Sequence, residues 1–278
     1  MFRICLRVKI NQVTTTEKQL ILKENMVEIC AIASGSNGNC YYIGNENEAV
    51  LIDAGITHRQ FLIRMEEKQL DVSKVKAIFI SHEHIDHVRG ARVLFKKLNI
   101  PIYFTKKTLE NTHYNSKPLE YNFFESDMPI LIGEIEVHPF TKNHDAVEPC
   151  SFRVVNNNVH VGVLTDIGEP CQNVITHVKQ CDALFIEANY DEKMLWQGAY
   201  PPHLKKRVAS DDGHLSNEQA YRLVANHSSG NLKYIFLSHL SAQNNTRELA
   251  LCAFEQLSKK CDVRVTYRDG VSDAIRIE

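Results

Sequence analysis

The chain has 278 residues with 32 Lys and Arg, 34 Asp and Glu, and a formal net charge of −2 at pH 7. A hydrophobic fraction of 44% with 24% charged residues is ordinary globular composition and allows a sizeable core. The near-neutral charge excludes a globally basic, nucleic-acid-coated surface but leaves room for a local basic groove. No apolar run reaches the roughly 18 residues of a membrane helix, and the N-terminus lacks the features of a signal peptide.

The order of apolar and polar residues predicts one layered α/β domain over residues 26–278. Residues 1–25 are polar and rich in Thr and Lys, and we predict either a peripheral or disordered extension there or a true start at Met26. Strand-like runs follow at 27–33, 40–43, 49–52, 75–80, 101–104, 135–139, 159–164, 183–187, 234–237 and 263–267. Helix-like runs lie at 58–68, 88–98, 171–180, 217–226 and 247–259. Ser216 with Gln219 predicts a capping box at the fourth of these helices.

The pattern of cysteines indicates the cellular compartment in which the protein resides. None of the eight forms a Cys-x-x-Cys pair, so neither a zinc ribbon nor a redox motif is indicated. We interpret them as small, mostly buried hydrophobic residues in a reducing compartment, which predicts a cytoplasmic protein.

The sequence SHEHIDHVRG, residues 81–90, carries the strongest chemical signal. It contains His82, His84, Asp86 and His87 directly after a strand-like run. Two imidazoles at i and i+2 on an extended turn can converge on one cation, while Asp86 and His87 reach a second. Zinc, manganese and iron accept such ligands. The alternative is a His-rich surface turn that binds nothing, and we predict that Glu83 within it faces solvent.

Three later residues have the same character. His144, Asp166 and His239 each follow the carboxyl end of a predicted strand, where open α/β sheets collect their binding sites. One histidine in such a place is more often structural than a ligand. Three such residues, two histidines and one aspartate, behind the first cluster favour a shared site.

In this order, Asp53 in LIDAG, the 82–87 cluster, His144, Asp166 and His239 resemble the motifs of the metallo-β-lactamase superfamily across residues 26–278. The resemblance implies a four-layered αββα sandwich with two divalent metal ions, Zn or Mn. It implies that one ion is bound by His82, His84 and His144, and the other by Asp86, His87 and His239. Asp166 would bridge the ions, and Asp53 would orient the site through hydrogen bonds.

Other motifs resemble the WalJ/YycJ-like nuclease branch of that superfamily. They are ASGSNGNCYYI (33–43), FIEANYD (185–191), GHLSNEQA (213–220) and SHLSAQNN (238–245). This resemblance implies an exonuclease that degrades DNA from its 5′ end. The short intervals between His144, Asp166 and His239 leave no room for a large inserted domain like that of ribonuclease J, or for the RNA-gripping arm of ribonuclease Z.

Two-metal chemistry serves lactams, thioesters and phosphodiesters alike, so the ligands alone indicate hydrolysis and not its substrate. Two features favour phosphate. The loop at 34–39 could present backbone N–H groups, with Ser36, Asn37 and Asn39, to an anion, although a tight hairpin turn explains it equally well. His214 precedes a capped helix and could stabilise a phosphoryl oxygen or protonate the leaving oxygen. We predict His214 and Asp86 as the catalytic residues.

Smaller signals stay open. The basic run 205–207 is more simply a solvated face, and Asn244 and Asn245 could contact substrate or cap a helix. The sequence favours a nuclease that acts on DNA and has no contact with a membrane. The alternative enzyme is a hydrolase of small cyclic phosphodiesters or thioesters. The sequence also allows a metal-free scaffold on this fold, although no ligand position is missing.

Overall fold

A computed structural model describes residues 26–112 and 121–278, and the extension expected at 1–25 lies outside the described residues. The strands are β1 Val27–Ala33, β2 Cys40–Gly44, β3 Ala49–Ile52, β4 Val75–Phe79, β5 Ile102–Phe104, β6 Asn122–Phe123, β7 Ile130–Ile132, β8 Ile135–Thr141, β9 Cys150–Asn156, β10 Val159–Leu164, β11 Ala183–Glu187, β12 Tyr234–Ser238, β13 Asp262–Val265 and β14 Ile275–Ile277. The helices are α2 His58–Glu67, α3 Ile85–Val88, α4 Ala91–Leu98, α5 Lys106–Asn111, α6 Gln172–Val178, α7 Glu192–Gln197, α8 Pro202–Val208, α9 Asn217–His227 and α10 Arg247–Ala253.

The strands form two mixed sheets. The first has the order β14-β1-β2-β3-β4-β5-β6, and the second has the order β13-β12-β11-β10-β9-β8-β7. In the first sheet β3 and β4 are parallel, and in the second β10, β11, β12 and β13 run parallel. Parallel neighbours end at the same edge, so each sheet presents several strand ends together at one side of the molecule.

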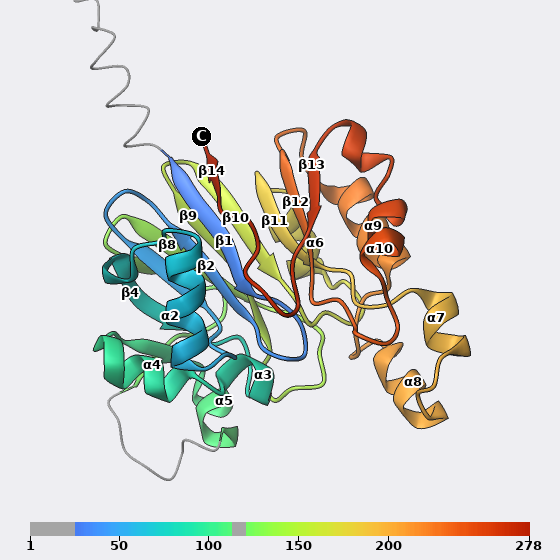
Figure 1. The fold of residues 1–278 in the computed structure, drawn as a ribbon, viewed down its shortest axis with the longest axis horizontal. Coiled ribbons are helices and arrows are strands. Elements are labelled where there is room, and N and C mark those ends of the chain that lie inside the picture. Colours follow the sequence, from blue (N-terminus) through green and yellow to red (C-terminus); the bar gives the residue numbers. More distant parts are fainter. Residues whose placement is uncertain (1–25, 113–120) are drawn as a thin grey trace, which may run out of the picture.

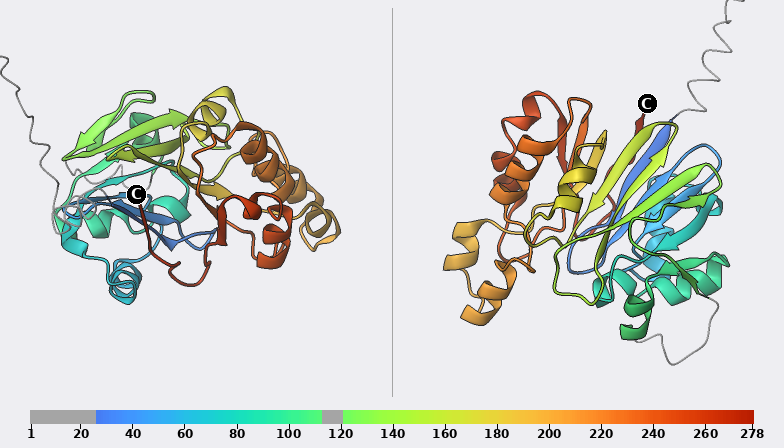
Figure 2. Two further views of the ribbon diagram at one scale, coloured as in Figure 1. Left: turned by 90° about the horizontal axis from the view of Figure 1, so that it is seen from above. Right: turned by 180° about the vertical axis from the view of Figure 1, so that it is seen from behind.

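The two sheets pack face to face with helices outside them (Figures 1 and 2). Side chains such as Tyr41, Phe79, Phe152, Phe185 and Phe236 fill the layer between the sheets. Each fully buried side chain of this size contributes roughly 1.5–3 kcal/mol to the free energy of unfolding. The α2 and α4 helices pack on the outer face of the first sheet, and α6, α9 and α10 pack on that of the second. The predicted αββα sandwich is confirmed.

The predicted elements match the structure closely, with instructive exceptions. The helix predicted at 88–98 begins three residues later, as α4 at Ala91, and Val88 instead ends the short helix α3, with Gly90 between the two. The Gly90 amide donates to Ala54 O at 2.8 Å, and a Cβ at this glycine would lie 1.8 Å from Ile56 O. This contact ties the chain against the segment after β3 and ends the first helix. The helix predicted at 247–259 ends at Ala253.

Several elements carry no clear periodic signal and were not predicted: β6, β7, β9, β14, α5, α7 and α8. The capping box of Ser216 and Gln219 at α9 is present as predicted. In the described part of the chain all seven cysteines are free; four are buried, and Cys252 is exposed. Within these same ranges, no helix is both long and apolar enough to span a bilayer.

Candidate metal centre

The candidate site forms where the two sheets bring strand ends together. Asp53 follows β3 and His82 lies just beyond β4 in the first sheet. In the second sheet Asp166 follows β10, Glu187 ends β11 and His239 follows β12. Because β3 is parallel to β4 and β10 to β12 are parallel, these side chains gather at one edge of the sandwich.

Three of these positions have left-handed backbone conformations. The φ angles are +62° at Asp53, +55° at Asp166 and +55° at His239. A residue other than glycine held in this region costs on the order of 1–3 kcal/mol, and such residues cluster at functional sites. The turns direct each side chain from its strand end into the site.

The first predicted ligand set is brought together. His82, His84 and His144 place one ring nitrogen each within 4.8 Å of the others. His82 Nε2 lies 3.1 Å from His84 Nδ1. His82 and His144 are buried, whereas His84 is partly exposed beside the opening of the site. Three converging imidazoles form a group that could hold one divalent cation.

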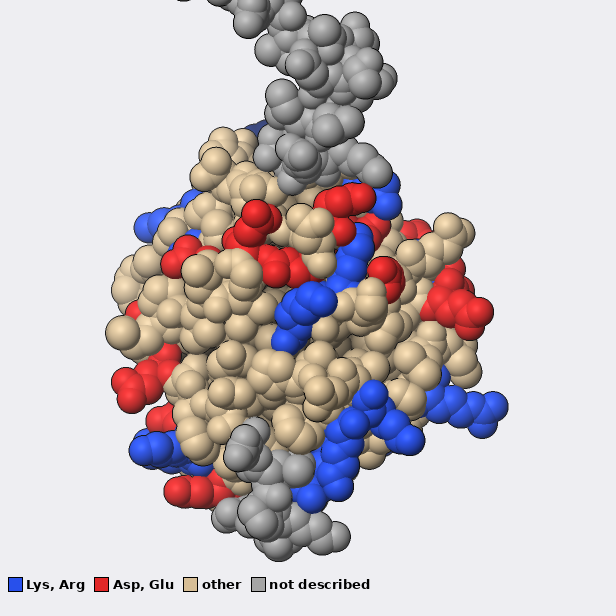
Figure 3. Space-filling view, turned by 90° about the vertical axis from the view of Figure 1, so that its left-hand side faces the viewer, with Lys and Arg blue, Asp and Glu red and all other residues tan. Residues whose placement is uncertain are grey.

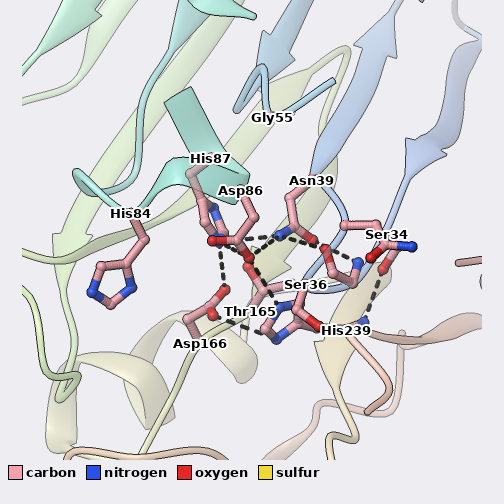
Figure 4. Close-up of polar contacts among 12 residues, drawn as sticks. Ser34, Ser36, Asn39, Gly55, His84, Asp86, His87, Thr165, Asp166 and His239 are labelled. Carbon is pink, nitrogen blue, oxygen red and sulfur yellow. Dashed lines mark hydrogen bonds and ion pairs between the residues drawn. The ribbon is translucent and has the colours of Figure 1, made fainter. Parts of the chain in front are cut away.

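The second predicted set lies beside the first (Figure 4). Asp86, His87 and His239 also lie within mutual ligand distance. Asp166 lies between the two groups, with Oδ2 3.2 Å from His87 Nε2 and Oδ1 3.9 Å from His144 Nε2. A carboxylate with one oxygen toward each group is placed to be shared by two cations. The structure therefore gathers all seven predicted ligands.

Hydrogen bonds fix the rings so that one nitrogen of each faces the site. Asp53 Oδ2 accepts from His87 Nδ1 at 2.7 Å, which leaves His87 Nε2 toward Asp166. Asp53 Oδ1 also accepts from the Ser81 amide at 2.8 Å, and this holds the carboxylate in place. Gly213 O lies 3.1 Å from His144 Nδ1 and plays the same part there. The predicted orienting role of Asp53 agrees with these contacts.

Glu187 is a site residue that the sequence analysis missed. It is fully buried, and its Oε1 lies 2.8 Å from His214 Nδ1 and 2.9 Å from His239 Nδ1. Its Oε2 accepts from the amides of Ile167 and Leu215. Because a carboxylate only accepts, both rings carry their proton on Nδ1 and present Nε2 as the free nitrogen. An acidic residue at the end of the apolar strand in FIEANYD was the available signal.

The pKa shifts of the histidines differ between the two ligand groups. Burial alone would lower the pKa of His87, but the carboxylates of Asp166, Asp53 and Asp86 outweigh it and raise the pKa well above its usual value. Burial also opposes a charged His239, yet Asp166, Asp86 and Glu187 raise its pKa to about 10. For His144, in the first ligand set, the nearby carboxylates do not outweigh burial. Burial lowers the pKa of His144 to about 4.

The residues fit divalent metal ions by a test independent of family. The Nε2 atoms of His144 and His239 are buried and have no hydrogen-bond partner among the described residues. Leaving such a nitrogen unpaired costs on the order of 1–3 kcal/mol. Imidazole nitrogens with carboxylates behind them are the donor set that zinc and manganese accept. The site can therefore hold metal cations.

The predicted substrate contacts are divided by the structure. Ser36 lines the cleft that opens over Asp86, Asp166 and His239, here called the ligand cleft, together with His84, Ile85, Arg207 and His214. Asn37 is exposed and bonds to Asp269 and Arg268. Ser36 and Asn37 therefore lie where they could contact a ligand.

Asn39 and Asn244 are not placed to contact substrate directly. Asn39 is fully buried, and its Nδ2 lies 3.1 Å from His87 Nε2 and 3.3 Å from Asp86 Oδ2. Asn244 is 1% exposed and lies outside the ligand cleft. The amides of Gly35, Gly38 and Asn39 donate within the protein, so they are not free to bind an anion. The tight-turn interpretation of the 34–39 loop is the better one for these three.

His214 and Arg207 border the ligand cleft, and Glu83 lies partly buried near it. His214 is half-buried and lines the ligand cleft, as does Arg207 at the end of α8. Arg207 Nε donates to Asp145 Oδ2 at 2.6 Å, so it is more than a solvated charge. The expectation that Glu83 faces solvent is wrong: its Oε1 accepts from the Val147 amide at 2.9 Å, and its Oε2 is buried.

The model of the beta-lactamase superfamily domain matches residues 48–236. The exodeoxyribonuclease YycJ of Bacillus anthracis is 34% identical over 229 residues, which cover 81% of this chain and 87% of that protein. The exodeoxyribonuclease WalJ of Streptococcus pneumoniae strain D39 is 35% identical, with 79% and 83% covered.

The fold comparison agrees. The metallo-β-lactamase fold protein YhfI of Bacillus subtilis superposes with a TM-score of 0.66 at 15% identity, covering 91% of this chain and all of that one. At this identity the likeness concerns the fold alone. The family model and the similarity to YycJ and WalJ over most of the chain show the family as well as the fold. By these matches, and by the two joined ligand groups at its strand ends, this chain belongs to the metallo-β-lactamase superfamily.

Proposed function

We propose that this protein is a metal-dependent exodeoxyribonuclease that hydrolyses phosphodiester bonds of DNA with two divalent ions, zinc or manganese. The observation that carries the proposal is the pair of ligand groups joined by Asp166. DNA as the substrate is supported by the similarity to YycJ and WalJ over about four-fifths of the chain, since each of these proteins is named an exodeoxyribonuclease. We also place the protein in the cytoplasm, in keeping with its free thiols.

One ion would be held by His82, His84 and His144, the other by Asp86, His87 and His239, with Asp166 between them. Two such ions, when bound, supply an activated water and neutralise the charge that develops on the phosphate. Asp53 and Glu187 keep the protons of His87 and His239 on Nδ1, so that the Nε2 atoms stay available as ligands. This arrangement is fixed before substrate arrives, which lowers the reorganisation needed during reaction.

His214 is proposed to act on the leaving group. Its Nδ1–H is held by Glu187, and the ring lies at the ligand cleft beside Asp166. In the protonated ring, Nε2 can give a proton to the departing oxygen, and the Glu187 carboxylate stabilises the imidazolium before that transfer. Arg207, at the same cleft, is placed to attract the phosphate.

The test uses the purified protein with Mn²⁺ or Zn²⁺ against end-labelled single- and double-stranded DNA, RNA and a small phosphodiester. Metal-dependent release of nucleotides from DNA ends is the expected result, with product length showing the polarity. Cleavage restricted to small esters would overturn the proposal in favour of a small-molecule hydrolase. A protein that takes up no metal and cleaves nothing would be a scaffold on this fold.

A further inference from the structure

A second cavity lies beside the ligand cleft and has no part in the proposed chemistry. Its volume is about 390 Å³, which falls in the range of roughly 300–1,000 Å³ typical of small-ligand sites. It lies between the segment after β12 and the segment after β13. We call it the arginine cavity because its lining includes Arg247 and Arg268, along with Ser34, Ser241, Thr246 and Tyr267.

The arginine cavity and the ligand cleft share a wall. Ser34 lines the cavity, and its Oγ accepts from the amide of the predicted ligand His239 at 2.8 Å. Ser36 lines the ligand cleft, and its Oγ accepts from Arg268 Nη2 at 3.1 Å. One loop therefore separates the two spaces, and Figure 4 shows Ser34 and Ser36 beside His239. A chain of linked phosphates could extend from one space to the other.

The two arginines of this cavity have donors to spare. Arg268 donates to Leu240 O, Ser36 Oγ and Asn37 Oδ1, all neutral acceptors. Within residues 26–112 and 121–278, Arg247 donates one side-chain hydrogen bond, to Thr266 O at 3.1 Å. A guanidinium carries more N–H groups than these contacts use. Asp269 also lines the cavity, and its Oδ1 accepts from Asn37 Nδ2 at 3.1 Å.

An aromatic surface completes the lining. The guanidinium carbon of Arg247 lies 4.3 Å from the centroid of the Tyr267 ring, and Tyr267 is 43% exposed. A stacked arginine and an exposed ring are the surfaces on which nucleic-acid bases pack. On the side of the molecule where α4 and β8 lie, by contrast, basic and acidic side chains are interspersed (Figure 3).

We propose that the arginine cavity binds the nucleotide next to the one being hydrolysed on the same DNA strand. Arg247 and Arg268 bind its phosphate, and Tyr267 contacts its base. The inference rests on the proposed nuclease function and deepens it, because it assigns a strand-positioning site outside the metal centre. Arg247 is the residue of choice for a test, since its contacts involve neither the metal ligands nor the loop at 34–39.

The experiment measures binding of a fluorescent single-stranded oligonucleotide by anisotropy at several salt concentrations, with metal present and hydrolysis blocked by a phosphorothioate backbone. The variants are Arg247→Gln, Arg247→Lys, Tyr267→Ala and Tyr267→Phe. Arg222→Gln on α9 is the matched control, because it removes the same charge from an exposed arginine paired with Glu218. Turnover of a small phosphodiester, with the melting temperature, shows whether each variant keeps an intact metal centre.

Arg247→Gln is expected to weaken binding about tenfold and to reduce the slope of log Kd against log salt by about 1. Arg247→Lys should restore most of the slope, and Tyr267→Phe should bind better than Tyr267→Ala. An Arg247→Gln variant whose Kd and slope match those of Arg222→Gln would overturn the inference while leaving the nuclease proposal intact. A wild-type protein that neither binds nor cleaves DNA would overturn both.

Discussion

Glu187 Oε1 lies 2.8 Å from Nδ1 of His214, and this contact joins the end of β11 to the segment that leads into α9. The same oxygen lies 2.9 Å from Nδ1 of His239. Despite full burial, which by itself would raise the pKa of Glu187, His214 and His239 lower that pKa to about 2. One charged carboxylate therefore sets the protonated nitrogen of a proposed ligand and of a proposed acid catalyst together.

Replacement of this carboxylate should affect both rings. In Glu187→Gln the Nδ1 atoms of His214 and His239 lose a charged acceptor, so we expect metal affinity or the single-turnover rate to fall about 10–100-fold. Metal titration and single-turnover cleavage of labelled DNA measure the two effects. Glu192→Gln, at an exposed position of α7, is the control for charge. A Glu187→Gln variant as active and as metal-loaded as that control would show that Glu187 is only structural.

His214→Ala separates acid catalysis from metal binding. If Nε2 of His214 gives a proton to the leaving oxygen, its loss should lower the chemical rate about 10²–10⁴-fold. Metal content and melting temperature should stay close to wild type, because the proposed ligand sets do not need this ring. His203→Ala, an exposed histidine on α8, serves as the control. An unchanged rate in a folded, metal-loaded variant would remove His214 from the mechanism.

Asp86→Ala tests the second ligand group. The carboxylate lies 3.5 Å from His87 Nε2 and 3.6 Å from His239 Nε2. We expect the variant to fold, to bind fewer metal ions per chain and to lose turnover. Elemental analysis after loading with Zn²⁺ or Mn²⁺ gives the count, which should be close to two ions in the wild type. Asp273→Ala controls for loss of an exposed carboxylate; equal metal content in both variants would exclude Asp86 as a ligand.

Arg153 and His177 form a polar pair away from the metal centre. Arg153 Nε donates to His177 Nδ1 at 3.1 Å, and the His177 ring stacks on Phe140 with 3.8 Å between centroids. Burial first, and then the charge of Arg153, lower the pKa of His177 from 6.5 to about 4. The folded protein therefore holds this ring neutral where the unfolded chain protonates it.

Between pH 6.5 and about 4 the unfolded chain binds more protons at His177, so the free energy of unfolding falls as the pH falls through this window. The contribution is on the order of 1 kcal/mol, reduced from the full linkage value because the ring is partly exposed. His177→Gln keeps an acceptor for Arg153 but cannot titrate, so its stability should fall less on acidification. Urea unfolding at pH 7 and pH 5 measures this. A pH dependence equal to that of wild type and of His203→Gln would contradict the assignment.

The sequence predicted most strands and the residues that gather at the strand ends, since both signals are local. A buried strand such as 159–164 is continuously apolar, and a histidine cluster such as 82–87 is compact enough to be read without a fold. The short strand β14 and the two helices α7 and α8 escaped prediction, because their residues have no clear period and are placed by neighbours far along the chain.

The difference between the site features that the sequence revealed and those that it did not reveal has the same origin. By itself the sequence determined which residues could bind metal, because the ligand types and their order carry that information. Only the tertiary structure decided that Glu187 controls His214 and His239, that Asn39 is buried against His87 while Ser36 lines the cleft, and that Arg247 lies at a cavity adjoining it. Each of these contacts joins segments distant in the sequence, and packing of the two sheets brings them together.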